Sequence, residues 1–87
     1  QNYPNPFNPV TTIQYQIPAV RDAVSSLKVT LKIYDMLGTE IATLVDGFKA
    51  AGYYKIDFNA AGLSSGVYFY TLKAGDYINT KKFVLLK

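Results

Sequence analysis

Leu27-Lys28-Val29-Thr30-Leu31-Lys32-Ile33-Tyr34 is the stretch of this 87-residue sequence that decides the fold. Apolar side chains occupy every second position, and lysine, threonine and tyrosine fill the positions between them. Successive side chains of a β-strand point to opposite faces of the sheet. The alternation therefore predicts a strand over 27–34, with Leu27, Val29, Leu31 and Ile33 inward and the other four residues in solvent.

Other segments show the same period of two. We expect Pro18 to end a first strand, because proline cannot donate a hydrogen bond to a ladder. The run from Val67 to Leu72 is apolar or aromatic at nearly every position, which favours a central strand covered on both faces. The last strand is expected over residues 77–86. In each of the other alternating segments, the period of two places these residues together on one face: Ile13, Tyr15 and Ile17; Ile41, Thr43 and Val45; and Tyr54, Ile56 and Phe58.

Turn residues separate these segments. Gly38 is expected to supply a positive φ that closes a hairpin after residue 34, and Ala74-Gly75-Asp76 predicts another tight turn. Loops are expected over residues 46–52 and 59–66. About seven short strands, with turn signals every 8–12 residues, predict an all-β fold, an antiparallel immunoglobulin-like β-sandwich. A small, partly open barrel is the alternative. No segment favours a helix longer than one turn.

The beginning of the chain differs from the rest. Residues 2–11, Asn-Tyr-Pro-Asn-Pro-Phe-Asn-Pro-Val-Thr, hold three prolines, which fix φ and push their predecessors toward extended geometry. We therefore expect residues 1–10 to be an extended lead-in and residues 11–87 to form one sandwich domain. Because the chain begins inside a motif and without methionine, we interpret it as the C-terminal module of a longer protein.

The composition excludes several classes of function. The chain has no cysteine and no histidine, which leaves no disulfide, no thiolate site and no imidazole base or ligand. A net charge of +3 is spread along the sequence and does not indicate nucleic acid. No apolar run is long enough to span a membrane, so we expect no membrane insertion. The first residues lack a basic region followed by an apolar one, so we do not expect them to be a signal peptide.

Catalytic and metal-binding chemistry has little support in the sequence. The six carboxylates fall mainly at turns or on exposed strand faces, and Ser64-Ser65 has no base nearby in the sequence. Asp46-Gly47 and Asp57-Phe58-Asn59 are only fragments of a calcium loop. We therefore expect a protein that is not an enzyme and that needs no cofactor or metal.

The aromatic residues and two lysines leave more than one interpretation. Tyrosines and a phenylalanine could form an exposed platform for sugars or a protein partner, although most such rings pack in the core of a small β-domain: Tyr53, Tyr68, Phe69, Tyr70 and Tyr77. Lys28 and Lys32 beside Tyr34 could bind anions, and a solvated sheet face explains them equally well.

Five stretches together resemble the type A C-terminal sorting domain of type IX secretion cargo. They are residues 2–9, Asn-Tyr-Pro-Asn-Pro-Phe-Asn-Pro; 31–38, Leu-Lys-Ile-Tyr-Asp-Met-Leu-Gly; 51–53, Ala-Gly-Tyr; 63–68, Leu-Ser-Ser-Gly-Val-Tyr; and 81–87, Lys-Lys-Phe-Val-Leu-Leu-Lys. Their order and spacing are similar to those of the family. The related immunoglobulin-like domain of flagellar hook-cap proteins shares part of the opening and of the Gly-Val-Tyr strand, with less similarity at the terminus.

The resemblance implies a function in export. It implies a tail, most simply a monomer, carried by an upstream cargo domain through the periplasm and recognised by outer-membrane secretion machinery. The cargo then reaches the cell surface or the medium, in many family members after a sortase-like protease removes the tail. An accessory immunoglobulin-like or carbohydrate-binding module of a secreted glycoside hydrolase is the alternative, and a hook-cap domain is a third.

The terminal apolar run is the candidate recognition segment. An apolar last strand offers an edge to a receptor, which would bind through main-chain hydrogen bonds and pockets for alternate side chains. Lys81-Lys82 interrupts the apolar pattern, either to protect the edge from aggregation or to give the receptor a charge. The candidate recognition residues are Gly66, Tyr68, Lys81, Lys82, Phe83, Val84, Leu85, Leu86 and Lys87.

Overall fold

A computed structural model describes residues 10–19 and 27–86 of the chain. These residues form six β-strands: β1 (Val10–Ile17), β2 (Leu27–Tyr34), β3 (Glu40–Lys49), β4 (Gly52–Asn59), β5 (Gly66–Ala74) and β6 (Tyr77–Leu85). The predicted lead-in over residues 1–10 lies outside the described residues apart from Val10, which already belongs to β1.

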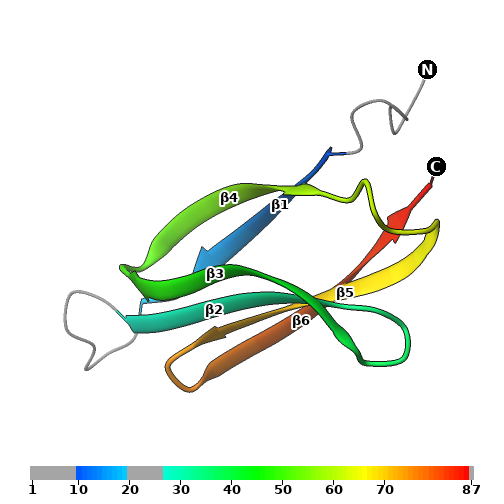
Figure 1. Ribbon diagram of the computed structural model, residues 1–87. Coiled ribbons are helices and arrows are strands. Elements are labelled where there is room, and N and C mark those ends of the chain that lie inside the picture. The colour runs from blue at the N-terminus through cyan, green and yellow to red at the C-terminus, as the bar shows by residue number, and fades with distance from the viewer. Residues whose placement is uncertain (1–9, 20–26, 87) are drawn as a thin grey trace.

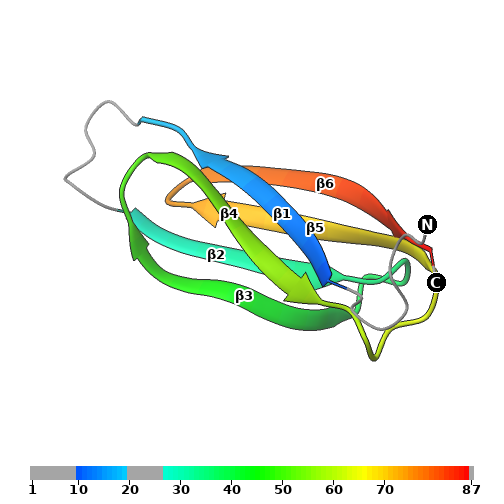
Figure 2. The same ribbon diagram turned by 90° about the horizontal axis from the view of Figure 1, so that it is seen from above.

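The strands form two antiparallel sheets that face each other (Figure 1). One sheet has two strands, β1 and β4, and the other has four in the order β3-β2-β5-β6. Figure 2 shows the two-stranded sheet crossing the four-stranded sheet obliquely, with β1 on the side of β6 and β4 on the side of β3. The predicted antiparallel β-sandwich is confirmed, with six strands in the described residues where about seven were expected.

The core lies between the sheets and is built by the predicted alternation. Val29, Leu31 and Ile33 on β2 are each 0% exposed. Opposite them, β1 contributes its predicted inward face, and Ile17 is 1% exposed just before Pro18 ends the strand. Together with β4, which contributes Phe58, these strands place their apolar faces in one core, which also contains Val45, Tyr68, Leu72 and Leu85.

β3 differs from its prediction in two ways. Thr43 does not share a face with Val45, because the register shift between Leu31 and Lys32 inserts an extra residue, Leu44, between them; a second shift lies between Ile33 and Tyr34. Bulges of this kind reverse the side-chain alternation. The loop expected over residues 46–52 is also wrong, since β3 continues to Lys49 and Ala50-Ala51 alone connects it to β4.

β5 is central, as predicted, but only one of its faces is covered by the other sheet. Tyr68, Leu72 and Ala74 are buried toward the core, whereas Val67 and Phe69 are half-buried on the outer face. Their partial burial comes from neighbours within the same sheet, since β2 and β6 flank β5. The apolar run from Val67 to Leu72 therefore correctly predicted the central position of β5 in its sheet. The prediction that both faces of this strand are covered is wrong.

Candidate recognition surface

The β5–β6 hairpin brings the two separated parts of the candidate segment together. Ala74-Gly75-Asp76-Tyr77 joins the strands, and Gly75 has the positive φ, 60°, that such a two-residue connection requires. In the resulting register Gly66 lies opposite Leu85 and Tyr68 lies opposite Phe83. Residues from β5 and β6 that are distant in sequence are therefore cross-strand neighbours at one end of the hairpin.

Tyr68, Phe83 and Leu85 hold this end of the hairpin in the core. The Tyr68 hydroxyl donates to the backbone oxygen of Ser64 at 2.8 Å, and the Tyr68 ring is 6% exposed. The Tyr68 and Phe83 rings stack with centroids 5.8 Å apart, and the Tyr70 ring also packs against Phe83, with centroids 6.0 Å apart. Since Leu85 is 4% exposed, these side chains position β6 and offer little surface to a partner.

The intervening residues of β6 face solvent on the outer side of the four-stranded sheet. Lys82 and Val84 alternate with the buried residues, and Leu86 follows them beyond the end of the strand. Val84 is 54% exposed and Leu86 is 63% exposed. This set, Lys82, Val84 and Leu86, is called the β6 outer row below; its two exposed apolar side chains are accessible to another protein.

Lys81 and Lys82 do not act as one doublet, because they point to opposite faces of β6. Lys82 lies opposite Phe69, whose side chain is on the outer face, whereas Lys81 lies opposite Tyr70, whose ring is on the core side. Lys81 remains exposed there and lines a cleft with residues of β1. The last candidate, Lys87, lies outside the described residues.

The sequence did not single out the apolar tip of the β2–β3 hairpin. Met36 is 70% exposed and Leu37 is 90% exposed, although they sit in a turn where polar residues are common. The Asp35 carboxylate accepts hydrogen bonds from the backbone N–H groups of Leu37 and Thr39, both at 2.9 Å, and Gly38 has the predicted positive φ of 85°. The occurrence of two large apolar residues in a turn was the sequence signal that could have identified this exposed tip.

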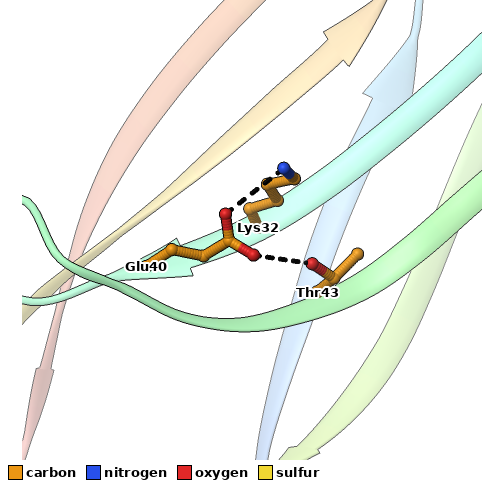
Figure 3. A network of polar contacts seen from close by, with 3 residues as sticks. All are labelled: Lys32, Glu40 and Thr43. Carbon is orange, nitrogen blue, oxygen red and sulfur yellow. Dashed lines mark hydrogen bonds and ion pairs between the residues drawn. The ribbon is translucent and has the colours of Figure 1, made fainter.

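The lysines of β2 are paired with carboxylates of β3. Lys28 Nζ lies 2.8 Å from Asp46 Oδ1, and Lys32 Nζ lies 3.3 Å from Glu40 Oε1. Figure 3 shows that Glu40 also accepts a hydrogen bond from the Thr43 hydroxyl, at 3.0 Å. These pairings favour the solvated-face interpretation of Lys28 and Lys32 over an anion site.

The same contacts shift the acidity of the two carboxyl groups. The hydrogen bonds from Thr43 and Lys32 lower the pKa of Glu40, and the hydrogen bond and charge of Lys28 lower the pKa of Asp46. Both carboxylates are therefore held in the charged form by partners on the sheet surface.

The aromatic residues do not gather into the exposed platform that was one of the two interpretations of the sequence. Tyr53 is 82% exposed on the two-stranded sheet, Tyr68 is in the core, and Phe69 lies on the outer face of the other sheet. In the described part of the chain no three acidic side chains cluster in a way that could hold a metal ion. Nor do those residues contain a helix of the length and apolarity needed to cross a membrane.

Comparison with protein families gives a match that runs over nearly the whole chain. The model of the secretion system C-terminal sorting domain matches residues 1–86. The chain belongs to this family. The sorting domain is thus a C-terminal signal for type IX secretion, and it directs the attached cargo to the cell surface or the medium. No match was found among the curated proteins or among the solved structures.

Family membership confirms the resemblance carried by the five sequence stretches. It also implies interaction with the type IX secretion machinery. A sorting signal acts by being bound and is not catalytic as such. The comparisons give no support to the alternative of a carbohydrate-binding or other accessory module.

Proposed function

We propose that the secretion machinery recognises the sorting domain at β6, through strand addition to its free edge and contacts with the β6 outer row. The observation that carries this proposal is the position of β6. It pairs with β5 on one side and with no other described strand on the other, so its outward main-chain groups are available to a partner. A nine-residue edge suits an added strand, whose main-chain hydrogen bonds give affinity.

In this proposal the inward and the outward side chains of β6 have different roles. Phe83 and Leu85 anchor the strand in the core, so the edge is held in a fixed position before a partner arrives. The β6 outer row then supplies specificity, because alternate side chains of an added strand would meet alternate side chains of β6. Gly66 and Tyr68 contribute by positioning β6 from β5.

We further propose that the domain acts as a monomer. Two copies that paired through β6 would bring four ammonium groups, from Lys81 and Lys82 of each, to one interface. Lysine on an edge strand opposes such pairing. Cleavage by a sortase-like protease after export is a further proposal, and its support is the resemblance to family members that are processed in this way.

Charge substitutions in the β6 outer row test the recognition proposal. Val84→Glu and Leu86→Glu in a secreted reporter fusion are expected to reduce export several-fold while the domain stays folded, because both side chains are more than half exposed. Phe48→Glu is the matched control: Phe48 is 72% exposed on β3, at the opposite edge of the same sheet.

The outcomes separate the possibilities. Circular dichroism must show that all three variants are folded. Normal export of both β6 variants would refute recognition at this surface, and an equal loss from Phe48→Glu would show that any outer-face charge blocks export. Lys82→Ala adds a second decision: reduced export supports reading of the charge by the receptor, and normal export leaves Lys82 the role of protecting the edge.

A further inference from the structure

We propose that the cleft between β1 and β6 is a second binding site, which accepts an extended acidic peptide segment as an added strand on β1. This site is on the core side of β6 and uses the other sheet, so it is distinct from the β6 outer row. The proposal stands independently of the function proposed above.

The cleft exists because the two-stranded sheet does not cover the first half of β6. Val29, Leu31 and Ile33 of β2 are completely buried, whereas on the same face of the sheet Tyr77 is 37% exposed, Asn79 is half-buried and Lys81 is exposed. A space of about 230 Å³ lies between these β6 residues and Gln14 to Gln16 of β1. A second hollow of about 430 Å³ shares Lys81 and the same three β1 residues, so the two are continuous around the β1 edge.

β1 borders this cleft with an unprotected strand edge. It pairs only with β4 among the described strands, over eight residues and without a register shift. Its sequence, Val-Thr-Thr-Ile-Gln-Tyr-Gln-Ile, contains no charge, proline or glycine. A long, regular and neutral edge of this kind is a template for another strand, which proteins ordinarily block with lysines, prolines or bulges.

The other three edges of the sandwich carry such blocking features. β6 has Lys81 and Lys82, and β4 has Lys55 and Asp57. β3 is interrupted by register shifts and carries several charged residues, Glu40, Asp46 and Lys49. Among the described strands, β1 is thus the edge that lacks such features, whereas a strand added at β6 has to accommodate Lys81 and Lys82.

Charge complementarity indicates that the added strand is acidic. The charged side chains that line the cleft and its continuation are Lys55 and Lys81, and no carboxylate lines either space. Within the described residues, the ion pairs formed involve Lys28 and Lys32 and leave these two lysines unmatched. A second copy of this chain would instead bring like charges together at the cleft, since the net charge is +3.

A peptide fits the cleft better than an anionic sugar does. Sugars bind aromatic residues through open ring faces, but Tyr15 and Tyr54 stack on each other with centroids 5.4 Å apart, and the exposed Tyr53 lines the second hollow and not the cleft. Tyr70 packs against Phe83. A sugar cannot form a ladder of hydrogen bonds with the outward main-chain groups of β1, whereas an extended peptide can. At about 3.3 Å per residue, the eight residues of β1 offer roughly 26 Å for pairing.

Titration of the 87-residue chain with designed peptides tests this inference. The probe is a capped eight-residue peptide of alternating valine and threonine, with two threonines replaced by glutamate. Its matched partners carry lysine in place of glutamate, or N-methyl groups on alternate amides that remove main-chain donors. We expect the acidic peptide to bind, to shift the amide resonances of residues 10–17, and to bind more weakly after N-methylation.

Charge reversal in the protein identifies the site. Lys81→Glu is expected to weaken binding of the acidic peptide on the order of tenfold or more and to favour the basic peptide. Lys73→Glu, an exposed position on the outer face of β5, is the control and leaves the affinity unchanged.

Three results would overturn the inference: equal affinity of the Lys81→Glu variant for the acidic peptide, peptide-induced shifts on β6 without shifts on β1, or binding of an oligouronic acid but of neither peptide. Because the test needs no secretion machinery, it separates this inference from the export function.

Discussion

Truncation of the central core leucine is expected to remove a large part of the domain's stability. Leu31 is 0% exposed, and Val29 and Ile33 beside it are equally buried, so the site has little freedom to collapse. Leu31→Ala deletes three methylene-sized groups, worth about 2.4 kcal/mol at about 0.8 kcal/mol each, and a residual cavity adds to this. We expect a loss of about 2.5–4 kcal/mol, against a total of roughly 4–13 kcal/mol for a chain of this length.

The chain offers the same chemical change at an exposed position as a control. Leu37 in the β2–β3 turn is 90% exposed, and Leu37→Ala is expected to change the free energy of unfolding by less than about 0.5 kcal/mol. Both variants are measured by urea titration and compared at an unchanged m-value. Similar losses from the two substitutions would refute the assignment of the inward face of β2, and with it the arrangement of the two sheets.

Three further perturbations follow from particular contacts. Tyr68→Phe removes the hydroxyl that donates to Ser64 and is expected to cost about 1 kcal/mol in urea titration; an unchanged free energy would mean that this bond is not a net contributor. Gly75→Ala adds a Cβ to a residue at φ 60° and is expected to destabilise the fold by about 1 kcal/mol and to lower the melting temperature by several degrees. An unchanged melting temperature would mean that residue 75 does not need a positive φ in this turn. The carboxyl pKa values of Glu40 and Asp46 are lowered in the folded state, so the two groups stabilise the fold above the ordinary carboxyl pKa, and this stabilisation is lost as the pH falls through the folded-state pKa values. Chemical denaturation from pH 7 to pH 2 should show a small decrease in the free energy of unfolding of the wild-type chain. The Glu40→Gln/Asp46→Asn variant should show a smaller decrease.

Local alternation was sufficient to predict the strands that have one buried face. The inward residues of β1, β2 and β4 follow directly from the period of two, because each of these strands runs without interruption between turn residues. The tight turns at Gly38 and Gly75 were equally readable, since positive φ selects glycine.

β3 could not be predicted in the same way, because its conformation depends on β2. The register shift between Leu31 and Lys32 puts Thr43 and Val45 onto different faces, and a second shift follows between Ile33 and Tyr34. Nothing in the β3 sequence marks where its partner requires them. Asp46 and Gly47 look like a turn in isolation, but they lie in the ladder opposite Thr30 and Val29.

The sequence predicted that the candidate recognition segment forms a strand, but it did not predict which residues surround each of its side chains. Alternation alone puts Lys81 and Lys82 on opposite faces of β6, but their surroundings depend on how far the two-stranded sheet reaches across its partner. Phe83 and Leu85 belong to the core contacts. Deletion of residues 81–87 would therefore unfold the domain and cannot by itself test recognition.

Export of a passenger by the intact domain tests the central claim most directly. A reporter with a signal peptide at its N-terminus and residues 1–87 at its C-terminus is expressed in a bacterium with type IX machinery and in an isogenic strain without it. We expect the reporter at the cell surface or in the medium of the first strain and in the periplasm of the second. Retention of the folded fusion in the periplasm of both strains would contradict the assignment of this chain as a sorting signal.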